Sequence, residues 1–212
     1  MESDFKKKNI KEICIANKVS VLGLQETMVP LMSELQIRSF WGNNSFDFCS
    51  QSSRGKSGGL ITIWDPVLFC KHSSFEGNDY LVVIGSCLPN AMQVDLINVY
   101  APQQPAQKNQ LWLSIRNTLL ENSNMAWIVF GDFNEVREEI DRRGSRFNSS
   151  NAAMFNNFIA SSRLFEIRCG RCRYTRIGSH GLKLSKLDRI LVTKHFLICF
   201  QSSCRDPSTQ LF

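Results

Sequence analysis

The stretch Trp127-Ile-Val-Phe-Gly-Asp-Phe-Asn134 opens with four apolar residues and turns polar directly after Gly131. A short apolar run that ends at a glycine is typical of a buried strand. Asp132 and Asn134 are therefore expected just past the C-terminal end of that strand. A rigid sheet holds side chains at its strand ends in fixed positions, which suits a binding or catalytic site.

Two other apolar runs end in the same way. Residues 19–24 are followed by Glu26, and residues 94–100 end at Tyr100. We expect these side chains to meet Asp132 in one cleft, although each of them alone also fits a solvated turn or ordinary packing. Converging carboxylates suit a hard divalent ion, Mg²⁺ or Mn²⁺ in its place. Such an ion would neutralise a phosphate oxygen while a second carboxylate orients or deprotonates the attacking water.

The rest of the chain alternates between helical and extended patterns. Apolar residues recur at helical spacing in some segments, and Gly, Pro, Asn and Asp separate several short apolar runs in others. These patterns predict helices over residues 5–18, near Pro30, over 105–120 and around Phe155, Phe158 and Ile159. They predict further strands over residues 46–49, 60–64, 80–87, 164–169, 173–175 and 187–192, those between 45 and 100 forming an antiparallel meander. Strands in two sheets with helices outside them indicate an α+β layered sandwich.

Composition restricts the class of protein. The chain has 212 residues and a formal charge of +6, with 43% hydrophobic and 21% charged residues. That balance excludes wholesale disorder, and the length favours a single domain over residues 1–212. No apolar run approaches the roughly 18 residues of a membrane span, and the first residues lack the apolar core of a secretory signal. We therefore expect an intracellular chain whose eight cysteines remain free thiols, with no disulfides.

Five short motifs follow one another along the chain. They are Leu24-Gln-Glu-Thr27, Gly58-Gly-Leu-Ile-Thr-Ile-Trp64, Asn98-Val-Tyr-Ala-Pro102, Gly131-Asp-Phe-Asn134 and Ser185-Lys-Leu-Asp-Arg-Ile-Leu-Val192. Their order resembles that of the endonuclease/exonuclease/phosphatase superfamily. The closest resemblance is to the apurinic-type endonuclease domain of plant LINE-like (non-LTR) retrotransposons and reverse-transcriptase-related proteins. It implies a four-layered, DNase-I-like α/β sandwich and Mg²⁺-assisted hydrolysis of phosphodiester bonds in DNA.

The resemblance also assigns roles to five residues. Glu26 resembles the family's metal-binding glutamate, and Tyr100 is similar to the tyrosine that contacts the scissile phosphate. Asp132 resembles the aspartate that positions or activates the nucleophilic water, and Asn134 the residue that helps to orient this water and the phosphate. Asp188 resembles the aspartate that orients a catalytic histidine.

Two parts of the family pattern have no counterpart in this sequence. The family opens with a strand whose Asn supports the metal site, and this chain begins at the helix that follows that strand. The family's closing Ser-Asp-His triplet is replaced by Ser208-Thr-Gln210. Losing a charge-stabilising group typically removes ~10²–10³ in rate. Losing several members of one site removes most catalysis. We therefore expect a fold truncated at both ends, without its first and last strands, and an inactive fragment is one of the open outcomes.

A basic stretch extends from Arg168 to Lys194 and contains a single acid, Asp188. Such a stretch can neutralise backbone phosphates in a salt-dependent and largely sequence-independent way, and it equally fits a solvated face. The candidate contacts to nucleic acid are Arg171, Arg173, Arg176, Lys183 and Lys186. The expected partner is DNA, or RNA in its place, and the resemblance implies a nuclear location.

Three functions remain open on this basis. The first is a Mg²⁺-dependent, endonuclease-like phosphodiesterase domain from a retrotransposon-type open reading frame. The second is a non-catalytic remnant of that domain that still binds nucleic acid. The third is a phosphatase of the same superfamily that acts on lipid or small-molecule phosphates.

Overall fold

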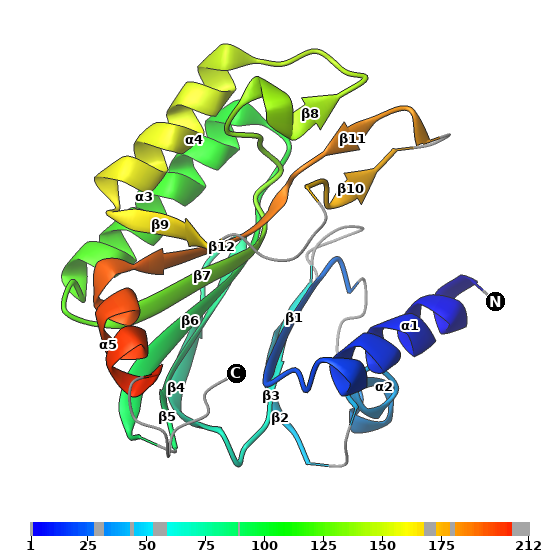
Figure 1. The fold of residues 1–212 in the computed structure, drawn as a ribbon, viewed down its shortest axis with the longest axis vertical. Helices are drawn as coiled ribbons and strands as arrows, with labels where there is room; N and C mark the ends of the chain where they lie inside the picture. The colour runs from blue at the N-terminus through cyan, green and yellow to red at the C-terminus, as the bar shows by residue number, and fades with distance from the viewer. Residues whose placement is uncertain are drawn as a thin grey trace.

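In the computed structural model, two β-sheets face each other, and the first four α-helices lie on their outer sides (Figure 1). The last helix packs its Phe196 into the core between the sheets. The structure describes residues 2–27, 32–42, 45–52, 59–88, 90–167, 173–178 and 181–204, with the side chains of residues 2–4 and 202–204 outside the description. Among the described helices, none is long and apolar enough to cross a membrane. The four layers expected from the resemblance are therefore present.

The smaller sheet supplies the second layer, and two helices cover its outer face. Its strands lie antiparallel in the order β1 (Val21–Gln25), β3 (Leu60–Trp64) and β2 (Asp47–Gln51), and the helices are α1 (Glu2–Ala16) and α2 (Glu34–Arg38). Ile61 and Ile63 of β3 pack with Ile37 and Trp41 in the cluster on the helix side. Because side chains alternate along a strand, Leu60 and Trp64 of β3 join the core on the other side, between the sheets.

The larger sheet has six strands and carries most of the candidate site. Their order is β4 (Phe69–Glu76), β5 (Tyr80–Cys87), β6 (Met92–Tyr100), β7 (Ala126–Asp132), β12 (Asp188–Thr193) and β9 (Leu164–Ile167). Only β6 and β7 are parallel neighbours among them. A parallel pair needs a crossover connection, and helix α3 (Pro105–Glu121) provides it.

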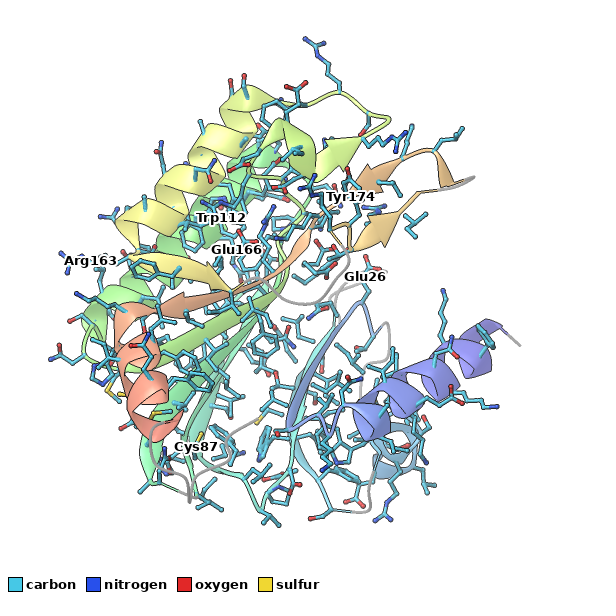
Figure 2. All side chains as sticks on the ribbon, viewed as in Figure 1. Glu26, Cys87, Trp112, Arg163, Glu166 and Tyr174 are labelled. Atoms are coloured by element: carbon cyan, nitrogen blue, oxygen red, sulfur yellow. The ribbon has the colours of Figure 1, made fainter. Side chains whose placement is uncertain are left out.

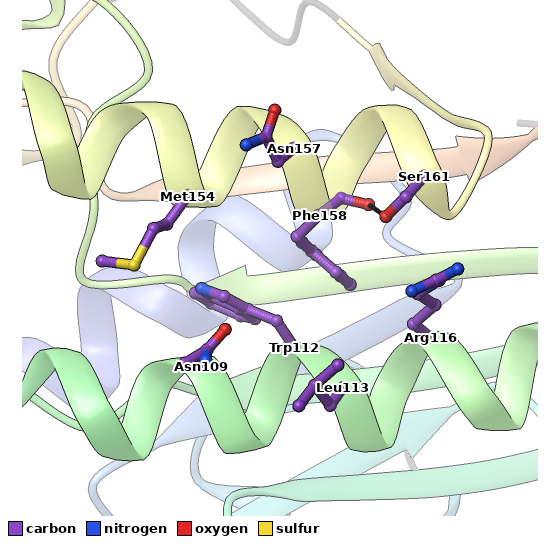
Figure 3. A pocket seen from close by; sticks show the side chains of 8 residues that line it. All are labelled: Asn109, Trp112, Leu113, Arg116, Met154, Asn157, Phe158 and Ser161. Atoms are coloured by element: carbon purple, nitrogen blue, oxygen red, sulfur yellow. Dashed lines mark hydrogen bonds between the residues drawn. The ribbon is translucent and has the colours of Figure 1, made fainter.

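Helices α3 and α4 (Ser149–Ser161) cover the outer face of the larger sheet. Trp112 of α3 stacks on Phe158 of α4 with ring centroids 4.8 Å apart (Figure 3). Trp112 also lies 5.9 Å from Phe133, which directly follows β7. Phe133 is fully buried, so the aromatic cluster anchors the chain between Asp132 and Asn134.

A third, small sheet and an ion-pair network complete the fold beside β12. The sheet runs β10 (Arg176–Ile177), β11 (Leu184–Ser185) and β8 (Arg142–Arg143), with β8 following the short 3₁₀ helix η1 (Glu139–Asp141), and helix α5 (Lys194–Cys204) follows β12. Arg189 of β12 is buried, and its guanidinium donates to Glu166 of β9 at 2.6 Å and to Asp141 of η1 at 2.7 Å. Lys186 and Arg137 also donate to Glu166.

The sequence predictions are confirmed for most elements and wrong for some. The expected meander is split, since β2 and β3 belong to the smaller sheet and β4, β5 and β6 to the larger one. Strand β4 and helix α5 were not predicted, and the strand expected over residues 173–175 lies at β10. The short helix expected near Pro30 begins at Glu34, and Pro30 itself is outside the described residues.

Candidate active site

Three of the predicted site residues lie in one row across the larger sheet. Tyr100 of β6 pairs in parallel register with Asp132 of β7, and Asp132 pairs with Asp188 of β12 on its other side. Gly131 makes the close approach of the strands at this row feasible. Its φ is +131°, and a Cβ there would lie 2.1 Å from the carbonyl oxygen of Val99, so a larger residue is excluded.

Hydrogen bonds fix the segment that follows β7. The backbone N–H of Asn134 donates to Oδ1 of Asp132 at 2.7 Å, while Asn134 itself has a φ of 48°. Asn tolerates this left-handed conformation better than most residues. The Asn134 side chain donates to the carbonyl of Ala101 at 2.7 Å and accepts from Gln103 at 2.7 Å. The predicted neighbourhood of Asp132, Asn134 and Tyr100 is thus brought together by backbone geometry.

Glu26 reaches this row from the opposite sheet. It directly follows β1 with a φ of 54°, and its carboxylate accepts a hydrogen bond from the Tyr100 hydroxyl. Figure 2 places Glu26 at the end of β1 that faces the small sheet around Tyr174. The site therefore spans the gap between the two facing sheets.

A hydrogen-bonded pair of side-chain amides joins the two sheets next to Glu26 and Tyr100. Gln25 of β1 donates to Oδ1 of Asn98 on β6 at 2.7 Å. The Asn98 amide group donates in turn to the carbonyl of Ile61 at 3.0 Å and contacts Thr62 Oγ1 at 3.3 Å. Asn98 is fully buried, and buried amides of this kind are costly unless they are hydrogen-bonded.

The electrostatic environment of Asp132 is unusual for a carboxylate. Burial raises the pKa of Asp132 to about 6, and the nearby charges of Asp188 and Glu26 act in the same direction. The hydrogen bond from Asn134 and the charge of Arg176 lower this pKa but do not outweigh burial. A carboxylate with a pKa near neutrality is suited to general-base catalysis.

The Tyr100 hydroxyl is held in its protonated form. Burial raises the pKa of Tyr100, and the hydrogen bond to Glu26 raises it further. A neutral phenol can donate a hydrogen bond to an oxyanion. Tyr100 therefore keeps a donor beside the Asp132 carboxylate, and its single proton is directed to Glu26.

Asp188 lies beside Asp132, but the described histidines lie elsewhere. The backbone N–H groups of Leu187 and Asp188 both donate to Thr175 Oγ1 at 3.0 Å, which fixes the start of β12. His72 contacts Ser86 across β4 and β5, and His195 lies in α5 beyond the other end of β12. His180 and residues 205–212, which include Ser208, Thr209 and Gln210, are outside the described residues.

The family model for the Endonuclease/Exonuclease/phosphatase family matches residues 2–209, nearly the whole chain. The chain belongs to the Endonuclease/Exonuclease/phosphatase family. No curated protein matches it. Family membership accounts for the shared order of the five motifs and for the facing sheets that carry them.

Solved structures from this family share the fold at low sequence identity. The AP endonuclease LMAP from Leishmania major is 17% identical with a TM-score of 0.69, covering 91% of this chain and 75% of that one. The endonuclease domain of TRAS1, a telomere-specific non-LTR retrotransposon, is 15% identical with a TM-score of 0.63, covering 91% and 81%. A mannosyl-6-phosphatase from Bacteroides thetaiotaomicron is 12% identical with a TM-score of 0.62, covering 89% and 76%. At these identities the likeness shows the fold and does not select a substrate.

The donor set of the site fits a hard cation bound through few protein ligands. Within the described ranges, no group of three or more His, Cys, Asp or Glu side chains is placed to hold a metal ion. Mg²⁺ is commonly bound by one or two carboxylates and completed by waters and substrate phosphates. Glu26 is an exposed carboxylate at the mouth of the site, so it fits this mode of binding.

The predicted basic residues separate into two groups. Arg173, Arg176 and Lys183 are exposed on or beside the small sheet, and the charge of Arg176 lowers the pKa of both Asp132 and Tyr100. Lys186 instead donates to Glu166 at 2.5 Å, within the ion-pair network. Arg171 is outside the described residues.

Two groups of residues around the site were missed by sequence reasoning. Lys108 and Glu135 form a buried ion pair at 2.7 Å, and Lys108 also donates to the carbonyl of Asn134 at 2.6 Å. The signal for Lys108 was its helical spacing with the buried face of α3 at Leu111 and Ile115. The second group, Arg142 and Arg143 of β8 with the nearby Arg146, adds positive charge next to the predicted basic stretch.

Proposed function

We propose that this domain hydrolyses phosphodiester bonds in DNA with Mg²⁺, or Mn²⁺ in its place, as cofactor. The observation that carries the proposal is the Asp132 carboxylate. It is partly buried, its pKa is raised to about 6, and it is flanked by Tyr100 and Asp188 in one row of the sheet. Burial of an acid at the end of two parallel strands is costly for folding, and a catalytic base is a physical reason to retain it.

Asp132 and Tyr100 would take different parts in the hydrolysis. One oxygen of Asp132 is held by the Asn134 N–H, so the other is free to accept the proton of an attacking water. The water oxygen bonds to phosphorus, the bond from phosphorus to one ester oxygen breaks, and the departing oxygen takes a proton from solvent. The Tyr100 hydroxyl has one proton, which it donates to Glu26. Once Glu26 holds the cation, this proton would turn to a phosphate oxygen.

Glu26 would hold the cation at the mouth of the site. When bound, Mg²⁺ withdraws negative charge from the phosphate and favours attack on it. Asn134 would orient the water and the phosphate, since Gln103 and Ala101 fix its side chain. Asp188, at the start of β12, has the role of orienting a catalytic histidine in the resemblance. Its negative charge also raises the pKa of Asp132.

DNA is the proposed substrate because exposed basic residues lie beside the site. Arg173, Arg176 and Lys183 come from the predicted basic stretch, and Arg142 and Arg143 join them through the small sheet. Cationic side chains around a site position a nucleic-acid backbone without reading its sequence. We propose that the domain is encoded by a plant LINE-like retrotransposon, because its five motifs occur in the order found there. A nuclear location is proposed from the same resemblance.

A second candidate is a domain that binds nucleic acid without cleaving it. The observation in its favour is that neither His72 nor His195 lies beside Asp188 in the described part of the chain. Losing a histidine that stabilises phosphate charge lowers the rate by ~10²–10³. Losing several members of one site removes most catalysis, while the basic face would still bind.

The test is nicking of supercoiled plasmid by the purified chain, with Mg²⁺ and with EDTA, beside a panel of phosphomonoesters. A DNA phosphodiesterase nicks the plasmid only with metal and leaves the monoesters intact. Plasmid binding without nicking from a folded sample would support the second candidate. Release of phosphate from the monoesters would instead identify a phosphatase and contradict the proposal.

A further inference from the structure

A hollow of mixed polar and apolar lining adjoins the site on the far side of Tyr100 from Asp188. Its volume is about 450 Å³, and parts of five segments line it. These are the end of β2, the start of β3, the turn between β4 and β5, the end of β6 and the first turn of α3. The volume is within the range of pockets that hold small organic ligands.

The walls of this hollow are fixed by hydrogen bonds. Gln51 is 5% exposed, and its amide group donates to the carbonyl of Gly77 at 2.5 Å. The backbone N–H of Tyr100 donates to the carbonyl of Asp79 at 3.0 Å, so both sides of the 77–79 turn are tied to neighbouring strands. On the helix side, the buried Lys108 anchors the first turn of α3 through Glu135. The hollow is therefore preformed.

The lining offers neutral hydrogen-bonding groups. Four glutamines contribute to it, and of the described lining residues only Asp79 is charged. A phosphate would need compensating positive charge, which these residues do not supply. Glutamine presents a donor and an acceptor together, the combination that pairs with the edge of a nucleobase. The lining glutamines are Gln51, Gln103, Gln104 and Gln107.

Gln103 connects the hollow to the row of Tyr100, Asp132 and Asp188, called the catalytic row below. The Gln103 amide group donates to Oδ1 of Asn134 at 2.7 Å, and the same residue lines the hollow. Tyr100, which accompanies Asp132 in the row, lines it as well. A group bound in the hollow would therefore lie next to a phosphate held at Tyr100.

We infer that this hollow is a nucleoside subsite, which receives a base adjacent to the scissile phosphate and uses Gln107 to read it. The inference rests on the proposed DNA phosphodiesterase function. Gln107 lies in the first turn of α3, is exposed, and makes no contact with the catalytic row among the interactions described above. It is a specificity residue rather than part of the catalytic machinery.

The first test does not depend on cleavage. The purified chain is titrated with each of the four deoxynucleosides and, separately, with inorganic phosphate, while the side-chain amide signals are followed by NMR. We expect at least one nucleoside to shift the Gln103 and Gln107 amide signals, and the Gln107→Ala variant to bind it at least fivefold more weakly. Gln110→Ala, one turn further along the exposed face of α3, is the matched control and should bind as the native chain does.

The second test reads sequence preference from cleavage. Nicked ends from a plasmid library are sequenced, and the native chain should show a base preference of about fivefold or more next to the nick, as one glutamine–base pair confers. Gln107→Ala should reduce this preference below about twofold, while Gln110→Ala should keep it. Nucleoside binding without nicking would contradict the proposed phosphodiesterase function and still support the nucleoside subsite. Nicking with amide signals that respond to phosphate alone, or to nothing, would overturn the subsite.

Discussion

The side chain of Gln25 donates to the buried Asn98 at 2.7 Å and so joins the smaller sheet to the larger one. One residue after Gln25 comes Glu26, and two residues after Asn98 comes Tyr100, the pair that closes the site between the sheets. The hydrogen bond between these two side-chain amides thus helps to set the distance between Glu26 and Tyr100, the proposed metal ligand and the proposed phosphate contact.

Replacing Asn98 with alanine should therefore loosen the contact between the sheets. The variant leaves the side chain of Gln25 and the carbonyl of Ile61 without their partner, and each unsatisfied buried group costs about 1–3 kcal/mol. We expect the free energy of unfolding in urea to fall by about 2–4 kcal/mol. Asn117→Ala, on the exposed face of α3, should change it by less than about 0.5 kcal/mol. Equal stability of the two variants would contradict a structural role for the amide pair.

The buried ion pair of Lys108 and Glu135 should stabilise the fold only while both side chains are present. Lys108→Met leaves the Glu135 carboxylate buried and unpaired, which typically destabilises a protein by about 3–5 kcal/mol. The double variant Lys108→Met/Glu135→Leu removes both charges and should recover most of that loss. Denaturant unfolding of the two single variants and the double variant measures the coupling. Additive losses would show that the two side chains do not act as a pair.

Glu166 makes stability depend on pH. Burial alone would raise its pKa, but the hydrogen bonds from Lys186 and Arg137 and the charge of Arg189 outweigh burial and lower the pKa to about 2. Because the folded-state pKa is below the ordinary value of 4.5, this stabilisation is fully present above about pH 4.5 and is lost as pH falls toward about 2. In Glu166→Gln, unfolding measured across that range should show a weaker acid dependence than in native protein. Glu121→Gln, at the exposed end of α3, should keep the native dependence, and a native-like slope in Glu166→Gln would refute the assignment.

Arg176 should contribute to DNA affinity through charge alone. It is exposed, and its charge reaches both Asp132 and Tyr100. We expect Arg176→Ala to weaken binding of any duplex sequence and to reduce the salt slope of affinity by about one, as the loss of one phosphate contact does. Fluorescence anisotropy at several salt concentrations measures this. Lys194→Ala, at the opposite end of β12, is the control, and an equal effect of both would place the DNA elsewhere.

The predictable part of the fold came from periodicity within single segments. The apolar run that ends at Gly131 and the helical spacing of Leu111, Trp112 and Ile115 both act locally, and β7 and α3 lie where they were expected. Strand β4 was not predicted because only Phe69 of its eight residues is buried, which leaves no alternating apolar pattern. Helix α5 was not predicted because its short apolar run fits a strand equally well.

The site was less predictable than the fold because its contacts join distant residues. Gln25 and Asn98 are 73 residues apart, and Lys108 and Glu135 are 27 apart. Only the register of β7 with β12 places Asp188 beside Asp132, and no local pattern encodes that register. The strand-end argument nevertheless selected Glu26, Tyr100 and Asp132, which the structure brings to one row and its facing sheet.

The role of Asp132 is measured most directly by the single-turnover rate of plasmid nicking by native protein and by Asp132→Asn at saturating DNA and Mg²⁺. We expect a loss of about 10²–10⁴-fold in the variant, the usual contribution of a general base. DNA affinity should stay within about threefold of native because the basic residues are intact. Nicking by Asp132→Asn within tenfold of the native rate would contradict the assignment of Asp132 as the catalytic base.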